Sequence, residues 1–139
     1  MDHDARASAE TLLIVDDEEM LVELLHRLVE RHGYRAYSAL GGREALTIFE
    51  AKRDEIDLVV TDLMMPGMDG RQLAQELLKQ DPSVRILIST GYSEPNDITY
   101  LLDAGARGIV MKPYQADRLL EAIQKALSDE PGATGEDAA

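Results

Sequence analysis

Two patterns of apolar residues alternate along the chain. Short, largely apolar runs of strand length occur five times, and three of them are almost continuously apolar, as is typical of strands covered on both faces. Between them lie stretches whose apolar residues recur every three or four positions, the spacing of an amphipathic helix. The predicted strands cover Thr11–Val15, 34–39, 58–61, 84–89 and 107–111, and the predicted helices cover 18–32, 43–53, 70–79, 95–103 and Ala116–Leu127.

This alternation predicts the architecture. Successive β–α units favour a parallel sheet with helices on both faces, which is an α/β doubly wound fold. The chain has 139 residues, the size of one domain. We expect that domain to cover residues 11–128, preceded by a short tail over 1–10. Over 129–139 small residues, glycine, proline and acids replace the periodic pattern, so we expect a disordered acidic tail there.

Composition narrows the classes of function. The chain has no cysteine, which excludes disulfides, thiol catalysis and cysteine-ligated metal sites. Its net charge is −13, and an acidic chain is a poor ligand for nucleic-acid phosphates or an anionic membrane surface. The longest stretch without a charged residue, 86–93, is too short to span a bilayer, and the first ten residues lack the apolar core of a signal peptide. We therefore expect a cytoplasmic protein that binds neither nucleic acid nor membrane directly.

Residues that could carry chemistry stand at the carboxyl ends of the predicted strands. Asp16 and Asp17 follow the first strand, Asp62 the third, Thr90 the fourth and Lys112 the fifth. In a doubly wound sheet these ends share one edge, where ligands bind. Carboxylates gathered there repel one another unless a cation joins them, and Mg²⁺ prefers carboxylates, waters and phosphate oxygens. Each residue alone could be a helix cap, a turn residue or a surface charge, but their coincidence favours a phosphoryl site with an aspartate nucleophile.

Four segments carry a resemblance to a known family. They read LLIVDDEE, VVTDLMMPGMDG, ILISTGY and VMKPY. Together they resemble, over about residues 11–128, the receiver domain of two-component response regulators. The resemblance implies a flavodoxin-like (βα)5 fold whose five parallel strands lie in the order 2-1-3-4-5.

The resemblance also implies roles for the acidic residues. Asp62 corresponds to the phosphoacceptor, which takes a phosphoryl group from the phosphohistidine of a histidine kinase or a histidine phosphotransfer protein. Asp17 corresponds to the direct ligand of Mg²⁺ and Asp16 to a ligand that acts through water, and Asp62 also belongs to the implied metal site. The backbone carbonyl of Met64 is expected to complete the protein's contribution to the metal shell.

The remaining site residues correspond to parts of a conformational switch. Thr90 resembles the hydroxyl that moves to meet the phosphoryl group, and Lys112 the cation that pairs with a phosphoryl oxygen. The peptide bond before Pro113 is expected to be cis. The chain departs from the family at Ile109, where many members carry an aromatic residue that rotates with the switch threonine. We therefore expect a weaker or differently built switch.

Two positions in the family set the lifetime of the aspartyl phosphate, and here they hold Met64 and Tyr92. Neither side chain can take a proton from water at neutral pH, and Tyr92 is large. We therefore expect a shielded and fairly long-lived acyl phosphate.

The resemblance predicts a signalling module rather than a turnover enzyme. Its output is partner binding or onward phosphotransfer in a phosphorelay, with a downstream protein that the sequence does not name. The residues after 128 are too few for an output domain, so we expect a stand-alone receiver or one excised from a hybrid histidine kinase or larger regulator. The predicted helix over 18–32, with Leu21 and Leu25, is the expected docking element, and its residues His26 and His32 are expected to be solvated.

Two alternatives from other classes stay open. A pseudo-receiver would bind a partner without phosphorylation, although such modules normally lose part of the acidic cluster that this chain keeps. A phosphohydrolase that works through an aspartyl phosphate would carry a second acid two residues after its nucleophile, where this chain has Met64.

Overall fold

The computed structural model describes residues 9–91, 99, 102–103, 105–113 and 115–128. Nearly all of both expected tails, most of the helix expected over 95–103, and Tyr92 lie outside these residues.

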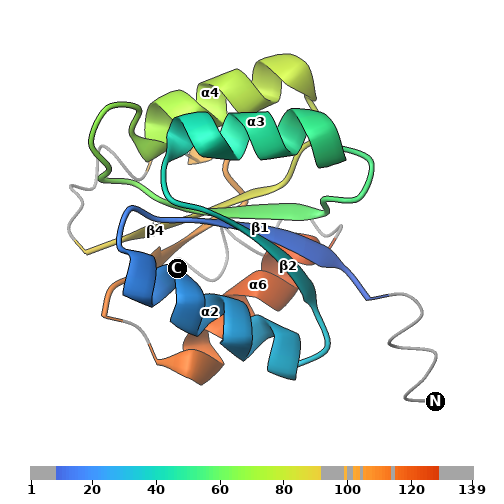
Figure 1. The fold of residues 1–139 in the computed structure, drawn as a ribbon, viewed down its shortest axis with the longest axis vertical. Helices are drawn as coiled ribbons and strands as arrows, with labels where there is room; N and C mark the ends of the chain where they lie inside the picture. The colour runs from blue at the N-terminus through green and yellow to red at the C-terminus, as the bar shows by residue number, and fades with distance from the viewer. Residues whose placement is uncertain (1–8, 92–98, 100–101, 104, 114, 129–139) are drawn as a thin grey trace.

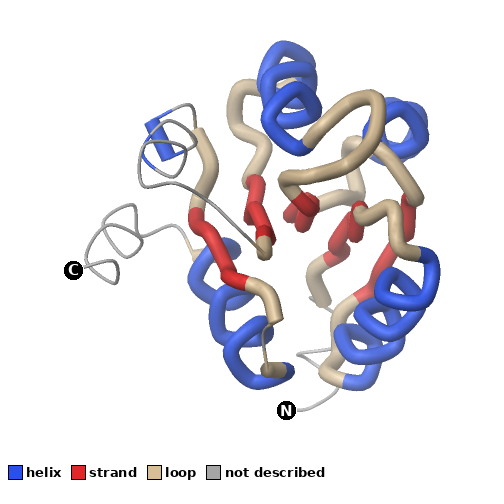
Figure 2. The backbone as a smooth tube through the Cα atoms, turned by 90° about the vertical axis from the view of Figure 1, so that its left-hand side faces the viewer, coloured by secondary structure: helices blue, strands red, loops and turns tan. Residues whose placement is uncertain are grey.

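The described residues form a parallel sheet of five strands flanked by helices (Figure 1). The strands lie in the order β2-β1-β3-β4-β5, which confirms the flavodoxin-like α/β topology. Helices α3 and α4 cover one face of the sheet, and α2 and α6 cover the other (Figures 1 and 2). The strands are β1 (Thr11–Val15), β2 (Arg35–Ala39), β3 (Leu58–Asp62), β4 (Ile86–Thr90) and β5 (Gly108–Met111), and the helices are α2 (Glu19–Arg31), α3 (Gly42–Lys52), α4 (Gly70–Gln80) and α6 (Ala116–Leu127).

Alternation along each central strand builds two hydrophobic cores. In β1, Leu13 packs toward α3 and α4, whereas Leu12 and Ile14 pack toward α2 and α6. Every residue of β1, β3 and β4 is buried, while the edge strands β2 and β5 are mostly half-buried. The central strands are therefore apolar on both faces along most of their length, and their buried polar residues lie in the first or the last two positions of a strand.

The strand boundaries differ from the prediction most at β4, which begins two residues later than expected. Ser83 donates from its backbone and its hydroxyl to the Asp81 carboxylate, and the Val84 amide donates to the Asp81 carbonyl. These bonds close a turn over 81–84, so the strand begins only after it. Among the described residues, no helix is both long and apolar enough to cross a membrane.

Candidate functional site

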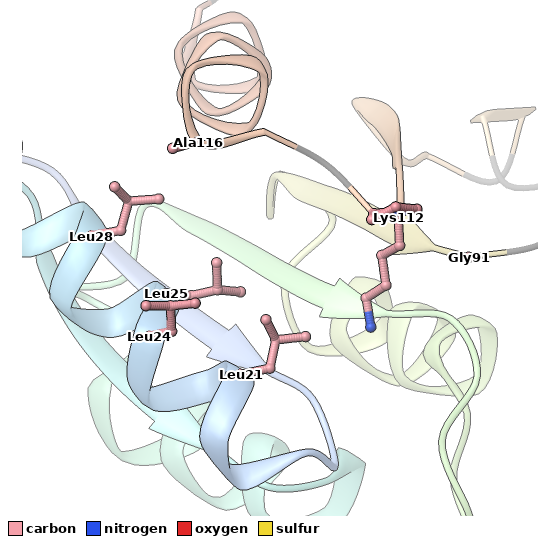
Figure 3. Close-up of a pocket in the computed structure, with 8 residues that line it drawn as sticks. Leu21, Leu24, Leu25, Leu28, Gly91, Lys112 and Ala116 are labelled. Atoms are coloured by element: carbon pink, nitrogen blue, oxygen red, sulfur yellow. The ribbon is translucent and has the colours of Figure 1, made fainter.

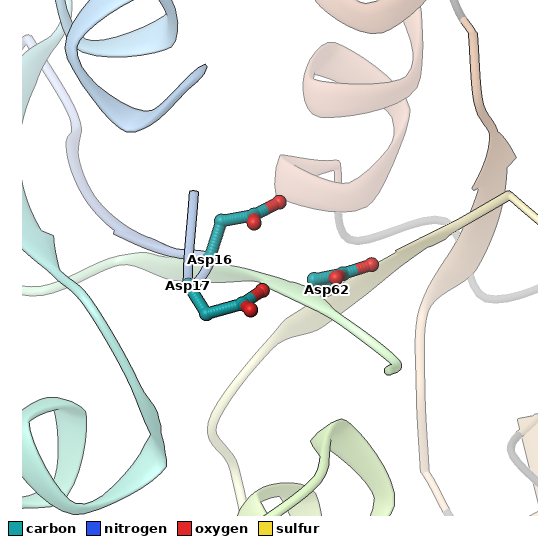
Figure 4. Close-up of side chains that lie close together, drawn as sticks. All are labelled: Asp16, Asp17 and Asp62. Carbon is teal, nitrogen blue, oxygen red and sulfur yellow. The ribbon is translucent and has the colours of Figure 1, made fainter. Parts of the chain in front are cut away.

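The sheet brings three aspartates together at the carboxyl ends of neighbouring strands (Figure 4). Asp16 and Asp17 directly follow β1, and Asp62 is the last residue of β3, which pairs with β1. One carboxylate oxygen from each residue lies within 4.8 Å of the others. Asp16 and Asp62 are buried, whereas Asp17 is exposed, so the cluster opens to solvent on the Asp17 side.

Both oxygens of the Asp16 carboxylate accept hydrogen bonds. Its Oδ1 accepts from the backbone N–H of Glu18 at 3.0 Å, and its Oδ2 accepts from Nζ of Lys112 at 2.9 Å. Glu18 is the N-cap residue of α2 and makes no capping bond with its own side chain. Asp16 therefore orders the entry to α2 while it also belongs to the acidic cluster.

Lys112 supplies a positive charge to this cluster. Its Nζ lies 3.4 Å from Oδ1 of Asp62, in addition to its bond with Asp16. The backbone N–H of Lys112 donates to the carbonyl of Thr90 at 2.7 Å, which joins the ends of β4 and β5. The Lys112–Pro113 peptide bond is cis. Three carboxylates and one ammonium give the cluster a formal charge of −2.

Burial and neighbouring charges shift the pKa values in the cluster. Burial raises the pKa of Asp62, and the charge of Asp16 raises it further, against the opposing effects of Lys112. Burial alone would lower the pKa of Lys112, but its hydrogen bond and ion pair with Asp16, together with Asp62, outweigh this, and the pKa is raised. An ionised Asp62 is therefore poorly compensated by the protein alone, which favours binding of a further cation.

The carboxylate geometry fits a small divalent ion. Oxygen ligands about 2.1 Å from Mg²⁺ can lie at most about 4.2 Å apart. The three aspartate oxygens, all within 4.8 Å of one another, are grouped on the scale of such a shell. Both Asp16 oxygens accept hydrogen bonds of 2.9–3.0 Å, whereas Lys112 lies farther from Asp62, at 3.4 Å, and Asp17 is exposed. Asp17 and Asp62 are therefore the better placed direct ligands.

The other residues singled out by the sequence lie around this cluster or outside the described residues. Thr90 is fully buried at the end of β4, beside the Lys112 backbone. Met64 follows two residues after Asp62 and its side chain is 67% exposed. Ile109 is half-buried and packs against the core under α3 and α4, away from α2 and α6. Tyr92 lies outside the described residues.

Two features near the site were missed by the sequence reasoning. Gly70, the first residue of α4, approaches the backbone of Asp62 and Leu63 closely. Leu24 and Leu28 join Leu21 and Leu25, the two residues named for docking, in lining an apolar cavity beside Lys112 that the sequence did not predict. The Asp69-Gly70 pair, at the start of the helix predicted over 70–79, was a signal for the close approach of Gly70. The apolar spacing along the whole helix predicted over 18–32 was a signal for the apolar cavity.

Comparison with known proteins identifies the family. The family model described as the response regulator receiver domain matches residues 12–124. Sporulation initiation phosphotransferase F of Bacillus subtilis is 34% identical over 118 residues, which cover 85% of this chain and 94% of that protein. Transcriptional regulatory protein GlrR of Escherichia coli is 35% identical over 125 residues, 90% of this chain but only 28% of that longer protein.

Solved structures agree with the family match. A response regulator receiver domain protein from Clostridium thermocellum is 30% identical, with a TM-score of 0.81 over 85% of this chain and 94% of that one. Response regulator protein TrrA from Thermotoga maritima, solved in complex with Mg²⁺ and BeF, is 34% identical, with a TM-score of 0.75 over 84% of this chain and 98% of that one. The chain belongs to the response regulator receiver family.

Proposed function

We propose that this receiver domain accepts a phosphoryl group on Asp62 from the phosphohistidine of a histidine kinase or histidine phosphotransfer protein. One observation carries the proposal: Asp16, Asp17 and Asp62 lie within 4.8 Å of one another, with the Lys112 ammonium 3.4 Å from Asp62. Asp17 and Asp62 would hold Mg²⁺ directly, Asp16 through water, and Met64 with its backbone carbonyl. When bound, Mg²⁺ neutralises charge on the transferring phosphoryl oxygens.

The protein's own residues perform the transfer. A carboxylate oxygen of Asp62 attacks phosphorus, the new O–P bond forms as the N–P bond to the donor imidazole breaks, and the electron pair stays on that nitrogen. Lys112 lies near enough to Asp62 to pair with a phosphoryl oxygen attached there. Thr90, buried at the end of the adjacent strand β4, is the hydroxyl proposed to meet the same group.

The residue two positions after the acceptor supports a signalling role over turnover. Met64 can neither accept nor donate a proton at neutral pH, so it supplies no general acid or base for hydrolysis of the aspartyl phosphate. Together with Tyr92, it is proposed to keep water from the phosphoryl group and lengthen its lifetime. The phosphorylated domain then acts by binding a downstream protein or by passing the group on.

The face of α2 next to the site is the proposed docking surface for the phosphodonor. Two large apolar side chains there point to solvent, Met20 with 85% and Leu24 with 63% of its surface exposed. Beside them lies a cavity of about 590 Å³ between α2 and α6 (Figure 3). Its described lining consists of Leu21, Leu24, Leu25, Leu28, Gly91, Lys112, Pro113 and Ala116.

This surface suits a donor for two reasons. Exposed apolar side chains that adjoin a cavity of this kind are typical of protein interaction sites. Lys112 contributes both to the cavity and to the acidic cluster, so a protein seated on α2 would place its phosphohistidine beside Asp62. A kinase or a phosphotransfer protein both satisfy this description.

Phosphoramidate tests the acceptor role, because its P–N bond reproduces that of phosphohistidine without a partner protein. The full chain is incubated with phosphoramidate and MgCl₂, and phosphorylated protein is separated by phosphate-affinity electrophoresis. We expect a phosphorylated band that depends on Mg²⁺ for the wild type and none for Asp62→Asn. A band of equal intensity in both proteins would refute Asp62 as the acceptor.

A further inference from the structure

The first turn of α4 lies directly against the end of β3. The backbone N–H of Gly70 donates to the carbonyl of Leu63 at 2.8 Å. A Cβ atom at position 70 would lie 2.3 Å from the carbonyl oxygen of Asp62 and 2.8 Å from Cα of Leu63. These are backbone atoms and cannot turn aside, and real Cβ contacts essentially never fall below 3.0 Å. Only glycine therefore permits this approach.

The contact fixes both ends of the loop that follows Asp62. Leu63, at the start of that loop, is bonded to Gly70 at its end. Asp69 and Gln72 form a capping box, in which each side chain accepts a hydrogen bond from the other residue's backbone N–H, at 2.8 and 3.0 Å. Met64 lies inside this closed loop, directly after Leu63, whose carbonyl accepts the bond from Gly70.

We propose that Gly70 is a positioning residue for the phosphoryl site, which lets the start of α4 hold the Asp62–Leu63 peptide and the Met64 carbonyl in place for metal binding and phosphoryl transfer. The inference rests on the proposed function for its phosphoryl part. A side chain at position 70 displaces the loop or the helix by about 1 Å, because its Cβ must move from 2.3 Å to an ordinary contact of at least 3.4 Å from the Asp62 carbonyl oxygen. A displacement of about 1 Å at a reacting group can cost about a hundredfold in rate.

Gly41, another glycine at the start of a helix, provides a matched control. A Cβ at Gly41, the N-cap of α3, would meet no atom within 4 Å. Gly42 is no control, because a Cβ there would lie 2.8–2.9 Å from Cβ, Cγ and Sδ of Met68, a residue of the loop between Asp62 and Gly70. Alanine is a better helix former than glycine, so helix propensity alone would favour alanine at Gly70, the first residue of α4.

The experiment compares Gly70→Ala with Gly41→Ala in the full chain. Four quantities are measured: the dissociation constant for Mg²⁺ with MgCl₂ alone, the initial rate of phosphorylation by phosphoramidate, the amide ¹⁵N–¹H signals, and unfolding by urea. For Gly70→Ala we expect a phosphorylation rate at least tenfold lower, weaker Mg²⁺ binding and displaced signals of Leu63 and Met64, with cooperative urea unfolding retained. Gly41→Ala is expected to stay within twofold of the wild type.

A Gly70→Ala protein with the wild-type Mg²⁺ affinity and phosphorylation rate, whether or not its unfolding midpoint falls, would overturn the proposal. If that variant does not fold, Asp69→Ala replaces it, because it loosens the first turn of α4 without a clash. Wild-type values in a folded Asp69→Ala protein would equally overturn the proposal. If the wild type itself takes up no phosphoryl group, the proposed function fails, while Mg²⁺ affinity and the amide signals still decide the role of Gly70.

Discussion

Replacing Lys112 by methionine removes the cation that compensates two buried carboxylates and keeps most of the aliphatic stem. Nζ of Lys112 lies 2.9 Å from Asp16 and 3.4 Å from Asp62. The side chains of these aspartates are only 3% and 8% exposed, whereas that of Lys112 is 21% exposed. The substitution therefore leaves two carboxylates together in a site that water reaches poorly, and we expect it to destabilise the fold.

The structure sets the size of this effect. At an effective dielectric constant of about 20, the attractions of Lys112 to Asp16 and Asp62 are about 6 and 5 kcal/mol. Desolvation of all three groups and repulsion between the carboxylates oppose them. Removing one partner of a buried ion pair costs about 3–5 kcal/mol, and the partial exposure of Lys112 places this case at the lower end. We expect Lys112→Met to lower the free energy of unfolding by about 3 kcal/mol at neutral pH without metal.

Acid and Mg²⁺ should both reduce this deficit. The pKa of Asp62 is raised, so the stability that its protonated form contributes is present at low pH and is lost as the pH rises through that value. In the variant, acidification toward about pH 4 therefore protonates Asp62 and removes its uncompensated charge. Mg²⁺ replaces the missing positive charge and should stabilise Lys112→Met more than it stabilises the wild type.

Urea unfolding followed by circular dichroism measures all of these differences. Lys79→Met is the matched control, since the Lys79 side chain is 74% exposed and only 3.5 Å from the exposed Glu76. We expect it to change the free energy of unfolding by less than about 0.5 kcal/mol. A deficit for Lys112→Met no larger than that of the control, or one that neither acid nor Mg²⁺ reduces, would refute the electrostatic account of the cluster.

Three further predictions concern the acceptor, the docking surface and the phosphoryl lifetime. Because burial and Asp16 raise the pKa of Asp62, Asp62→Asn should be more stable than the metal-free wild type at neutral pH, and the difference in stability should vanish as acid protonates Asp62. Urea titrations across pH measure this difference, and one that grows in acid would contradict the prediction. Leu24→Glu places a charge on the proposed docking surface, so the rate of transfer from a phosphorylated histidine phosphotransfer protein, divided by the rate with phosphoramidate, should fall at least tenfold. An unchanged ratio would place docking elsewhere. The double variant Met64→Asn, Tyr92→Ala should lose its phosphoryl group faster than the wild type after the donor is removed, and an equal or slower loss would disprove shielding.

The convergence of the site residues could be predicted because it follows from topology. Continuous apolar runs identify the central strands, and parallel strands end at one edge, so Asp16, Asp62 and Thr90 had to gather there. The pattern says only which strand each residue ends, however. It does not say that Lys112 bonds to Asp16 more closely than to Asp62, because that depends on how far the lysine stem reaches across the sheet.

Contacts between different elements were less predictable. His26 was expected to be solvated, but its Nδ1 lies 2.6 Å from Oγ of Ser38 and its Nε2 3.1 Å from Oε2 of Glu30. The contact with Ser38 depends on how α2 packs over the edge strand β2, and the spacing of apolar residues along a helix does not specify this packing. Gly70 was expected only to begin a helix, and its close approach to β3 depends on the path of the intervening loop.

The central claim is that Asp62 is the phosphoacceptor, and the mass of the intact protein after incubation with acetyl phosphate and Mg²⁺ tests it most directly. The account predicts the addition of one phosphoryl group to the wild type, none to Asp62→Asn, and none to the wild type when Mg²⁺ is chelated beforehand. The same adduct on Asp62→Asn would contradict the account. So would an unmodified wild type that also fails to bind beryllofluoride in the presence of Mg²⁺.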